Sequence, residues 1–296
     1  MLEGEPPSVY ACYRFAAKLR AYKPLLDACL ARVTASLHAE LPEMGTDLAI
    51  DASDMPAYAN GQRYLSKNGP ERQRYSDSDA TWGHRSAVST RKGGGFYGYR
   101  LHAAVCARTD LPVAWRVETA ASHESNYVAS LLDTVKARGF DPDTCALDMG
   151  YDNNRVYGEC EERDARPIIP LRETPAVKAG KAGPPSFEHG TWRFAGSDSK
   201  RGASKWRCPT GECSPASRWL AADRLHPLVP RETPRWRKLY RGRAAVEREF
   251  GRLKHEWALA PLRVRGLDRV ALHADLTILA KLACALSRAR AVPLAA

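Results

Sequence analysis

The sequence lacks the features that mark exported and membrane-spanning proteins. Its first residues, MLEGEPPSVY, do not combine a charged start with an apolar run, so they do not resemble a secretory signal. The most apolar stretch runs from Val270 to Leu286. It is interrupted by His273, Asp275 and Lys281, which is typical of a core helix rather than a membrane span. We therefore expect a cytoplasmic protein that does not enter a membrane.

The cysteines show no pattern of disulfide pairs. Several of the eight lie within apolar runs, where a free thiol behaves as a small hydrophobe, and a chain of 296 residues does not need disulfides. This favours a reducing cytosol. Cys208 and Cys213, with His189 and His226 nearby, raise the possibility of zinc. Their spacing is at the long end of the usual range and no second cysteine pair accompanies them, so the sequence favours no zinc and leaves a structural zinc site as the alternative.

A surplus of positive charge is the clearest signal in the composition. Lys and Arg number 45 against 34 Asp and Glu, which gives a formal net charge of +11. Such a surplus favours a polyanionic partner, because basic side chains release counterions from the phosphates that they bind. Composition alone is nearly as compatible with a basic protein that has no such partner. The hydrophobic fraction of 44% is ample for one large domain or two smaller ones.

The first half of the chain contains short apolar strands and helices around one long polar segment. Residues 1–46 have helical spacing with a break at Pro24, and we interpret them as a helical N-terminal remnant. Residues 59–95 predict a long loop, in which the basic clusters Arg72–Arg74 and Arg91–Gly95 are candidate contacts to DNA backbone. The other strand-like and helical runs alternate as strand, strand, strand, helix, strand, helix, strand: 48–50, 96–106, 111–117, 125–138, 144–147, 153–163 and 167–171. This order predicts an α/β fold with a mixed five-stranded sheet flanked by helices.

The second half of the chain begins with a change of composition between residues 172 and 237. Pro and Gly become dense, and short aromatic runs replace the helical periodicity. We interpret this segment as a largely β insertion whose small core contains Trp192, Trp206 and Trp219. Stacking of one tryptophan on an unpaired DNA base is the less favoured alternative. Helical periodicity returns at Tyr240, so the expected core comprises residues 47–171 and 238–296, with the insertion between them.

Two acidic residues lie at the ends of short apolar strands. Asp51 follows Leu48–Ile50, and Asp148 follows Thr144–Leu147. Functional sites are often built at strand ends in sheets with parallel strands. A turn-forming role explains either aspartate alone about equally well, so their positions make them candidates and no more.

A third acid lies in the helical pattern near the C-terminus. At about 100° per residue, Tyr240, Arg243, Glu247 and Lys254 fall on one arc beside the apolar stripe of the helix. Glu247 thus borders a buried face, and the three groups beside it are able to bind phosphate. The alternative is a solvated face stabilised by pairing of Arg243 with Glu247 one turn away.

These motifs together resemble those of a known family. The spacing Tyr-x2-Arg-x3-Glu-x6-Lys over residues 240–254 is similar to the signature around the catalytic glutamate of bacterial insertion-sequence transposases of the DDE type, within the ribonuclease H-like superfamily. Ile50–Ser53 resembles the first aspartate motif, and Asp148–Asp152 (DMGYD) resembles the second. Gly98–His102 and the segment 111–123 resemble the second and third strands of that fold. The resemblance runs from about residue 46 to residue 286.

The resemblance implies a ribonuclease H-like fold with a catalytic set of Asp51, Asp148 and Glu247. Two Mg²⁺ or Mn²⁺ ions would be held by these carboxylates, since hard cations take oxygen ligands. Tyr240, Arg243 and Lys254 would grip phosphates near the transposon end. The implied activity is cleavage at insertion-sequence ends followed by joining to target DNA. The implied partners are double-stranded DNA and a second copy of the chain in a homodimer, in the cytoplasm of a bacterium and associated with its nucleoid.

Other functions and roles stay open. A truncated or domesticated DNA-binding protein would keep the fold without activity, although the presence of all three acids argues against it. A plain metal-dependent nuclease would cleave without strand transfer. His102 and His123 lie on elements that border the expected site, and a structural role is the better interpretation of both. The basic turn Arg263–Arg269 is expected to contact phosphates rather than bases.

Overall fold

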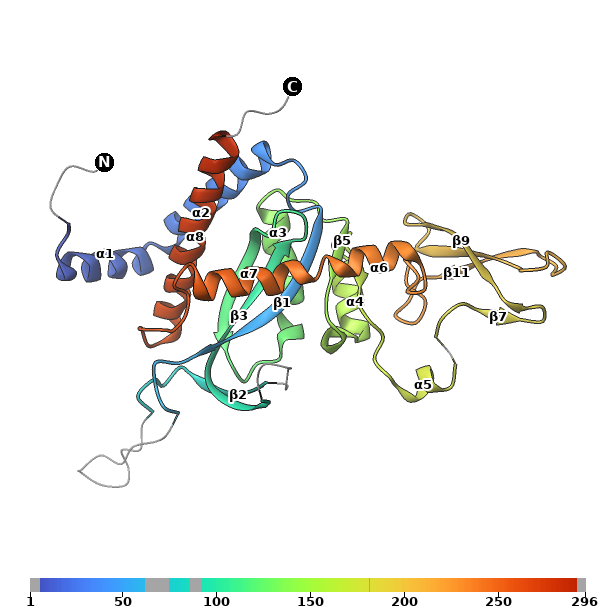
Figure 1. Cartoon of the computed structure of the whole chain (residues 1–296), viewed down its shortest axis with the longest axis horizontal. Helices are drawn as coiled ribbons and strands as arrows, with labels where there is room; N and C mark the ends of the chain where they lie inside the picture. The colour runs from blue at the N-terminus through green and yellow to red at the C-terminus, as the bar shows by residue number, and fades with distance from the viewer. Residues whose placement is uncertain (1–5, 62–74, 86–91, 181, 292–296) are drawn as a thin grey trace.

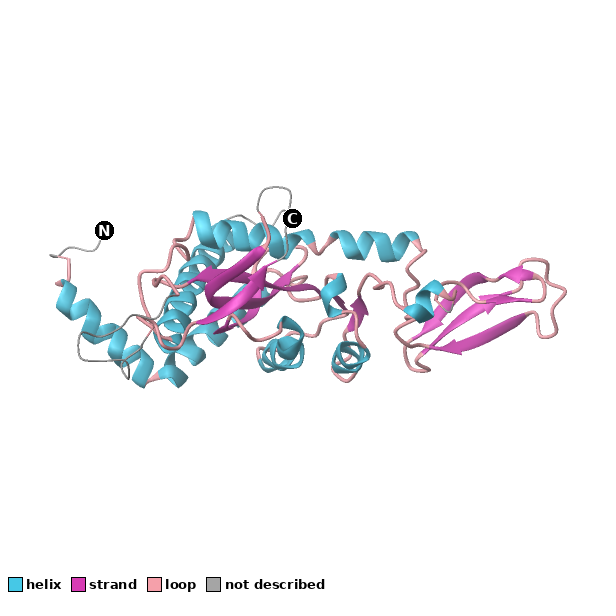
Figure 2. Ribbon diagram, turned by 90° about the horizontal axis from the view of Figure 1, so that it is seen from below, coloured by secondary structure: helices cyan, strands magenta, loops and turns pink. Residues whose placement is uncertain are grey.

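A mixed sheet at the centre of the molecule carries helices on both faces, and a small β unit extends from one end of it (Figures 1 and 2). The computed structural model describes residues 6–61, 75–85, 92–180 and 182–291. The basic cluster Arg72–Arg74, and Arg91 of the second cluster, lie outside these residues.

The central strand of the sheet is β1 (Asp47–Pro56). It pairs in antiparallel fashion with β3 (Gly94–Cys106) on one side and in parallel with β5 (Thr144–Ala146) on the other. β6 (Arg166–Ile168) continues the parallel part, and β4 (Pro112–Thr119) pairs antiparallel with β3. The strand order β4-β3-β1-β5-β6, with helices connecting the parallel strands, confirms the expected mixed α/β, ribonuclease H-like class.

A sixth strand lies within the segment that was expected to be a loop. Thr81–Arg85 forms β2, which pairs with the first residues of β3 and extends the sheet from five strands to six. The expectation of a loop throughout residues 59–95 was therefore wrong here. Trp82 packs beside Tyr97 with ring centroids 5.6 Å apart, although 53% of Trp82 remains exposed. A half-exposed strand of polar composition carries no apolar run, so only its cross-strand partners reveal it.

Two helices connect the parallel strands. α3 (Val128–Ala137) buries Val128, Leu131, Leu132 and Val135, the apolar positions whose spacing predicted it. A 3₁₀ turn, η2 (Glu124–Tyr127), precedes it in place of the expected first helical turn. α4 (Asn154–Glu161) begins where the Asn153 side chain accepts a hydrogen bond from the Val156 amide at 3.1 Å.

The chain ends pack together on one side of the sheet. α1 (Val9–Ala21) and α2 (Lys23–Glu40) are separate helices, and Pro24 stands in the first turn of α2. Both contact α8 (Leu267–Ala291), which also packs on β4. In Figure 1 this group forms the end of the molecule that lies opposite the β unit.

By length and composition, α8 is the one helix of the described residues that is apolar enough to cross a membrane. Its two buried charged residues, Asp275 and Lys281, have partners within the protein. Lys281 pairs with buried Glu249, and Asp275 accepts a hydrogen bond from Trp115 Nε1 at 2.8 Å. These contacts explain the polar residues that interrupt its sequence, because a buried charge requires a partner. They are the contacts of a core helix.

The segment from Tyr240 onward is not one continuous helix. α6 (Pro234–Arg241) and α7 (Ala244–His255) are separated by Gly242 and Arg243. The junction is a tightened turn, because Arg243 N donates to Tyr240 O at 3.0 Å and Val246 N donates to Arg243 O at 3.2 Å. Gly242 faces Ala107 so closely that a Cβ there would lie 3.0 Å from the alanine Cβ. The prediction that Tyr240, Arg243, Glu247 and Lys254 lie on one helix was therefore wrong, because Tyr240 belongs to α6 and Glu247 and Lys254 belong to α7. Helical periodicity in the sequence carries no information on this tertiary contact.

The segment 172–237 contains a short helix and five short strands. α5 (Pro175–Lys178) is followed by the hairpin of β7 (Ser186–Phe187) and β8 (Gly190–Thr191). A three-stranded antiparallel sheet then forms in the order β11-β10-β9, from β9 (Arg193–Asp198), β10 (Ala203–Arg207) and β11 (Ser217–Ala221).

Two of the three tryptophans of this segment occupy its core. Trp192 and Trp206 are buried, as expected. Trp219 is 39% exposed, with the Arg201 guanidinium 5.0 Å from its ring centroid, so its assignment to the core was wrong. Trp219 lies opposite Lys205 in the antiparallel pair of β11 with β10. Because alternate residues of a strand face opposite sides of a sheet, strand register decides this difference.

Buried polar contacts fasten the segment to the main sheet. Asp152, at the end of the DMGYD motif, accepts hydrogen bonds from Arg224 Nη1 at 2.6 Å and from the Arg172 amide at 2.8 Å. Arg231 donates to Ile169 O at 2.9 Å and to the Tyr157 hydroxyl at 2.6 Å. The two ends of the segment thus return to the same place on the core.

Replacement of Asp152 tests this attachment. In Asp152→Ala the Arg224 guanidinium, whose side chain is 16% exposed, loses its carboxylate partner. We expect the free energy of unfolding to fall by about 3–5 kcal/mol, the usual cost of removing one member of a buried ion pair. Urea unfolding measures this change. Asp133→Ala removes the 61% exposed partner of Arg163 and should leave the midpoint nearly unchanged, whereas equal midpoints for both variants would contradict the assignment.

Candidate active site

The three candidate acids line one cavity. Asp51 lies in β1, Asp148 follows β5, and Glu247 lies in the first turn of α7, which packs across β1 and β3. The cavity has a volume of about 680 Å³. Residues almost 200 positions apart in the sequence therefore meet, because β1 pairs with β5, the strand that precedes Asp148, and α7 packs on β1.

Arg243 joins two of these acids. Its Nη2 lies 2.9 Å from Asp51 Oδ2, and its Nη1 lies 2.7 Å from Glu247 Oε1. The Arg243 and Asp51 side chains are 18% and 14% exposed, whereas that of Glu247 is 59% exposed. The guanidinium places a positive charge between two carboxylates that would otherwise repel each other.

Asp148 is held by its own turn. Its Oδ1 accepts a hydrogen bond from the Gly150 amide at 2.7 Å, which caps the 3₁₀ turn η3 (Met149–Tyr151). A Cβ on residue 150 would lie 2.8 Å from Asp148 Oδ1 and 3.1 Å from Glu124 Oε1. A larger residue at position 150 would therefore displace the ends of the Asp148 and Glu124 side chains from their present positions.

Glu124 is an acid of this cavity that the sequence did not reveal. It stands on η2 just after β4, and burial together with the Asp148 carboxylate raises its pKa. Asp54 also lines the cavity, with Arg100 Nε 3.6 Å and Arg85 Nε 3.5 Å from its carboxylate. Glu124 neither ends an apolar strand nor lies in a helical stripe. The sequence pointed to this position only through the neighbouring His123, which was expected to border the site. His123 also lines the cavity, and its ring forms a hydrogen bond with the Ser125 hydroxyl.

The electrostatics of the site favour the neutral form of Asp51. Burial, opposed by the Arg243 charge and assisted by the negative charges of Asp148 and Glu124, raises the pKa of Asp51 to about 7. Two acids with raised pKa values, Asp51 and Glu124, in one cavity are typical of a functional site rather than of a structural ion pair.

The remaining candidates lie farther from the acids. Tyr240, on α6, stacks on Trp236 with ring centroids 4.9 Å apart, and burial raises its pKa. Lys254 lies two turns after Glu247 on α7 and is not among the described residues that line the cavity. His102 is buried in β3 against Tyr127, and burial lowers its pKa to about 3, so it is neutral at physiological pH.

The sequence matches the transposase DDE domain model over residues 43–282, which include every element of the cavity. The chain belongs to the transposase DDE domain family. This confirms the family resemblance of the sequence motifs. The bacterial insertion-sequence origin and the role of the Tyr-Arg-Glu-Lys signature remain predictions.

Among the solved structures to which the chain is similar is that of a transposase. This is the cryo-EM structure of a piggyBac transposase synaptic complex with hairpin DNA, with 11% sequence identity and a TM-score of 0.34. The match covers 85% of this chain and 55% of that one, so the chain spans about half the length of the transposase that it matches. No curated protein shows significant similarity to the sequence.

The raised pKa of Asp51 makes the stability of the metal-free protein depend on pH. Stability linked to this group is fully present below its ordinary pKa of 3.8 and is lost as pH rises through about 7. From pH 5 to pH 8 we expect the free energy of unfolding to fall by roughly 2–3 kcal/mol through this group. Asp51→Asn removes the titrating carboxyl group. The free energy of unfolding of this variant should therefore fall between pH 5 and pH 8 by roughly 2–3 kcal/mol less than that of the wild type.

Urea unfolding in the presence of a chelator, at unit steps from pH 5 to pH 8, measures the effect of Asp51. Asp141→Asn is the control, because Asp141 is a surface acid whose side chain is 91% exposed. Parallel pH profiles for wild type and Asp51→Asn would show that Asp51 does not carry the buried charge.

Proposed function

We propose that this DDE-domain chain is a DNA transposase that cleaves phosphodiester bonds at insertion-sequence ends and joins them to target DNA by two-metal catalysis. The observation that carries the proposal is the convergence of Asp51, Asp148 and Glu247 in one open cavity. All three acids lie within residues 43–282, the part of the chain that matches the transposase DDE domain model. The net charge of +11 supports a polyanionic substrate.

The donor set suits hard divalent cations. The acids of the cavity offer carboxylate oxygens, which Mg²⁺ and Mn²⁺ prefer, and the cavity has no cysteine among its described lining residues. The Arg243 guanidinium already lies between Asp51 and Glu247, which shows that the site accommodates positive charge there. We assign Asp51, Asp148 and Glu247 as the metal ligands. When bound, two such ions supply activation of the attacking oxygen and stabilisation of the leaving oxygen.

Basic side chains around the acids suit the DNA backbone. Arg100 and Arg85 line the cavity from β3 and β2, and both lie near the Asp54 carboxylate of β1. Arg243 pairs with two carboxylates in the metal-free protein, and cations bound to those carboxylates would free its guanidinium for a phosphate. Tyr240 and Lys254 complete the proposed phosphate-binding set, as neighbours of the cavity rather than members of its lining.

We also propose that the protein binds double-stranded DNA, both at the transposon ends and in the target. In the DNA complex it would be a homodimer. We place the protein in the bacterial cytoplasm, at the nucleoid. A plain nuclease would use the same acids, so the joining step is what separates the two functions. A domesticated DNA-binding protein would not cleave at all.

Substitution of the acids tests catalysis. We expect Asp51→Asn, Asp148→Asn and Glu247→Gln each to lower Mn²⁺-dependent cleavage of oligonucleotides bearing the element's ends by at least about 10²-fold, because each removes an oxygen charge from the metal site. Denaturing gels resolve cut and joined strands. Cleavage without joining in the wild type would identify a nuclease, and no cleavage under any metal would overturn the enzymatic proposal. Glu43→Gln, on the surface, should retain full activity.

Substitution of Arg243 tests binding of the DNA backbone. Arg243→Ala should weaken affinity for the end by about tenfold and lower the salt dependence of binding by about one ion, with little change in far-UV circular dichroism. Fluorescence anisotropy in Ca²⁺ over a range of salt concentrations measures both quantities. Arg248→Ala is the control, because Arg248 pairs with Asp110 away from the cavity. Unchanged affinity and salt slope would refute the phosphate-binding role of Arg243.

A further inference from the structure

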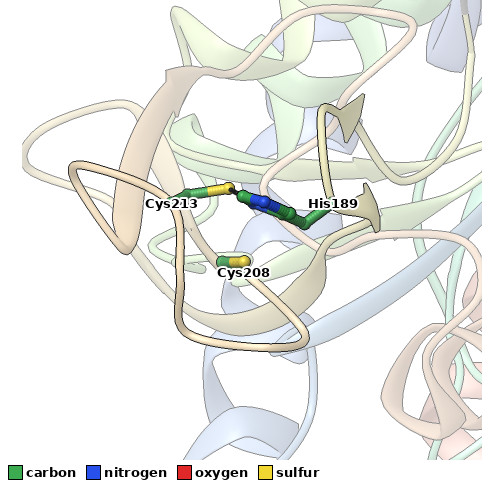
Figure 3. Close-up of side chains that lie close together, drawn as sticks. All are labelled: His189, Cys208 and Cys213. Carbon is green, nitrogen blue, oxygen red and sulfur yellow. Dashed lines mark hydrogen bonds between the residues drawn. The ribbon is translucent and has the colours of Figure 1, made fainter.

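Three side chains with metal-binding atoms meet at one end of the β unit, far along the chain from the acids (Figure 3). His189 lies in the two-residue connection of the β7–β8 hairpin, Cys208 follows β10, and Cys213 lies in the connection from β10 to β11. Their donor atoms all lie within 4.8 Å of one another, and His189 Nδ1 is 2.9 Å from Cys213 Sγ. Two separate hairpins thus bring their donors to one point.

The distances suit one shared ion. Zinc binds cysteine sulfur at about 2.3 Å and histidine nitrogen at about 2.0–2.1 Å, and tetrahedral geometry then separates neighbouring ligand atoms by roughly 3.5–3.8 Å. The separations in the cluster, from 2.9 Å to at most 4.8 Å, bracket this value. Adjustments of about an ångström in side-chain position would centre an ion among the three atoms.

The chemistry of the donors also selects zinc. Two thiolates and an imidazole suit Zn²⁺, whereas the oxygen ligands that Mg²⁺ prefers belong to the acidic cavity. The Cys208 sulfur lies 3.3 Å from the Thr210 hydroxyl. It also accepts hydrogen bonds from the backbone N–H groups of Thr210 and Cys213. The Glu212 carboxylate lies 3.9 Å from His189 Nε2, the ring nitrogen on the side away from the Cys213 contact.

The β unit has little else to hold it together. The buried members of its hydrophobic cluster are Trp192, Trp206 and Cys208. The β7–β8 hairpin is two residues long on each side, and such a hairpin has marginal stability by itself. Units with so small a core usually depend on a metal or on disulfides, and all eight cysteines, which lie among the described residues, are free.

We propose that His189, Cys208 and Cys213 bind one zinc ion, with the fourth position open to water, and that this ion ties the β7–β8 hairpin to the β10–β11 connection. The spacing of the two cysteines and the lack of a second pair had made zinc the weaker interpretation of the sequence. The structure supplies the third ligand from a different hairpin. The inference is independent of the proposed transposase activity, because it concerns a different metal and different residues.

Metal analysis of the full chain, expressed with zinc and purified without chelator, tests the site. We expect about one zinc ion per chain, retained on dialysis, and a loss of most of it in His189→Ala, Cys208→Ser and Cys213→Ser. Cys12→Ser and Cys284→Ser remove exposed cysteines of α1 and α8 and should keep the ion. Asp51→Asn should keep it too, which separates this site from the acidic cavity.

Titration of metal-free wild type with Co²⁺ provides a readout that does not depend on the folding of variants. A sulfur-to-cobalt charge-transfer band with the intense visible absorption of tetrahedral cobalt is expected, and zinc should abolish both. Hydrogen exchange should slow on zinc binding in residues 186–221. Wild type that takes up no zinc with its thiols reduced, zinc content unchanged in Cys208→Ser, or a Cys208–Cys213 disulfide in the purified protein would each overturn the proposal.

Discussion

The Arg243 guanidinium between Asp51 and Glu247 is the interaction on which the acidic cavity depends. Several carboxylates share one partly buried space, and like charges at close range raise the free energy of the folded state. Arg243 offsets part of this cost for two of them at once. It stands at the junction of α6 and α7, where Gly242 packs against Ala107. The break between α6 and α7 therefore positions the Arg243 guanidinium, whose positive charge reduces the repulsion among the clustered carboxylates.

The segment from Asp148 to Asp152 links the cavity to the β unit. Asp148 faces the cavity, Gly150 leaves room for it and for Glu124, and Asp152 holds Arg224 and the Arg172 amide. The residues that present an acid to the cavity and those that anchor the insertion thus occupy one short turn.

Most of the fold could be predicted from periodicity. The strands β1, β3, β4, β5 and β6 and the helices α3 and α4 carry continuous apolar runs or stripes, because each buries a face in the core. The strand β2 could not be predicted, since its residues are mostly polar and its pairing partner is distant in the sequence. The break between α6 and α7 was missed for a related reason, because the close approach of Gly242 to Ala107 is a tertiary contact.

The candidate site was predicted in part. Asp51 and Asp148 were visible as acids that follow short apolar runs, and Glu247 was visible through its spacing from Arg243. The expectation that Asp51 ends its strand was wrong, because β1 continues to Pro56 in its pairing with β3. Glu124 had no such pattern, and its place in the cavity follows from the path of the chain after β4. Lys254 was grouped with Glu247 because both lie on the same face of a helix. Helical spacing does not say how far along that face the cavity extends, and Lys254 is not among its described lining residues.

The sequence by itself determined the family, the class of fold and the three acids, because apolar periodicity and motif spacing are local properties that a chain displays without folding. Only the tertiary structure decided which charged groups meet. Arg243 with Asp51, Asp152 with Arg224, and His189 with the two cysteines are pairings across 192, 72 and at most 24 residues. Electrostatic and coordination energies depend on distance in space, which becomes defined when strands and helices pack.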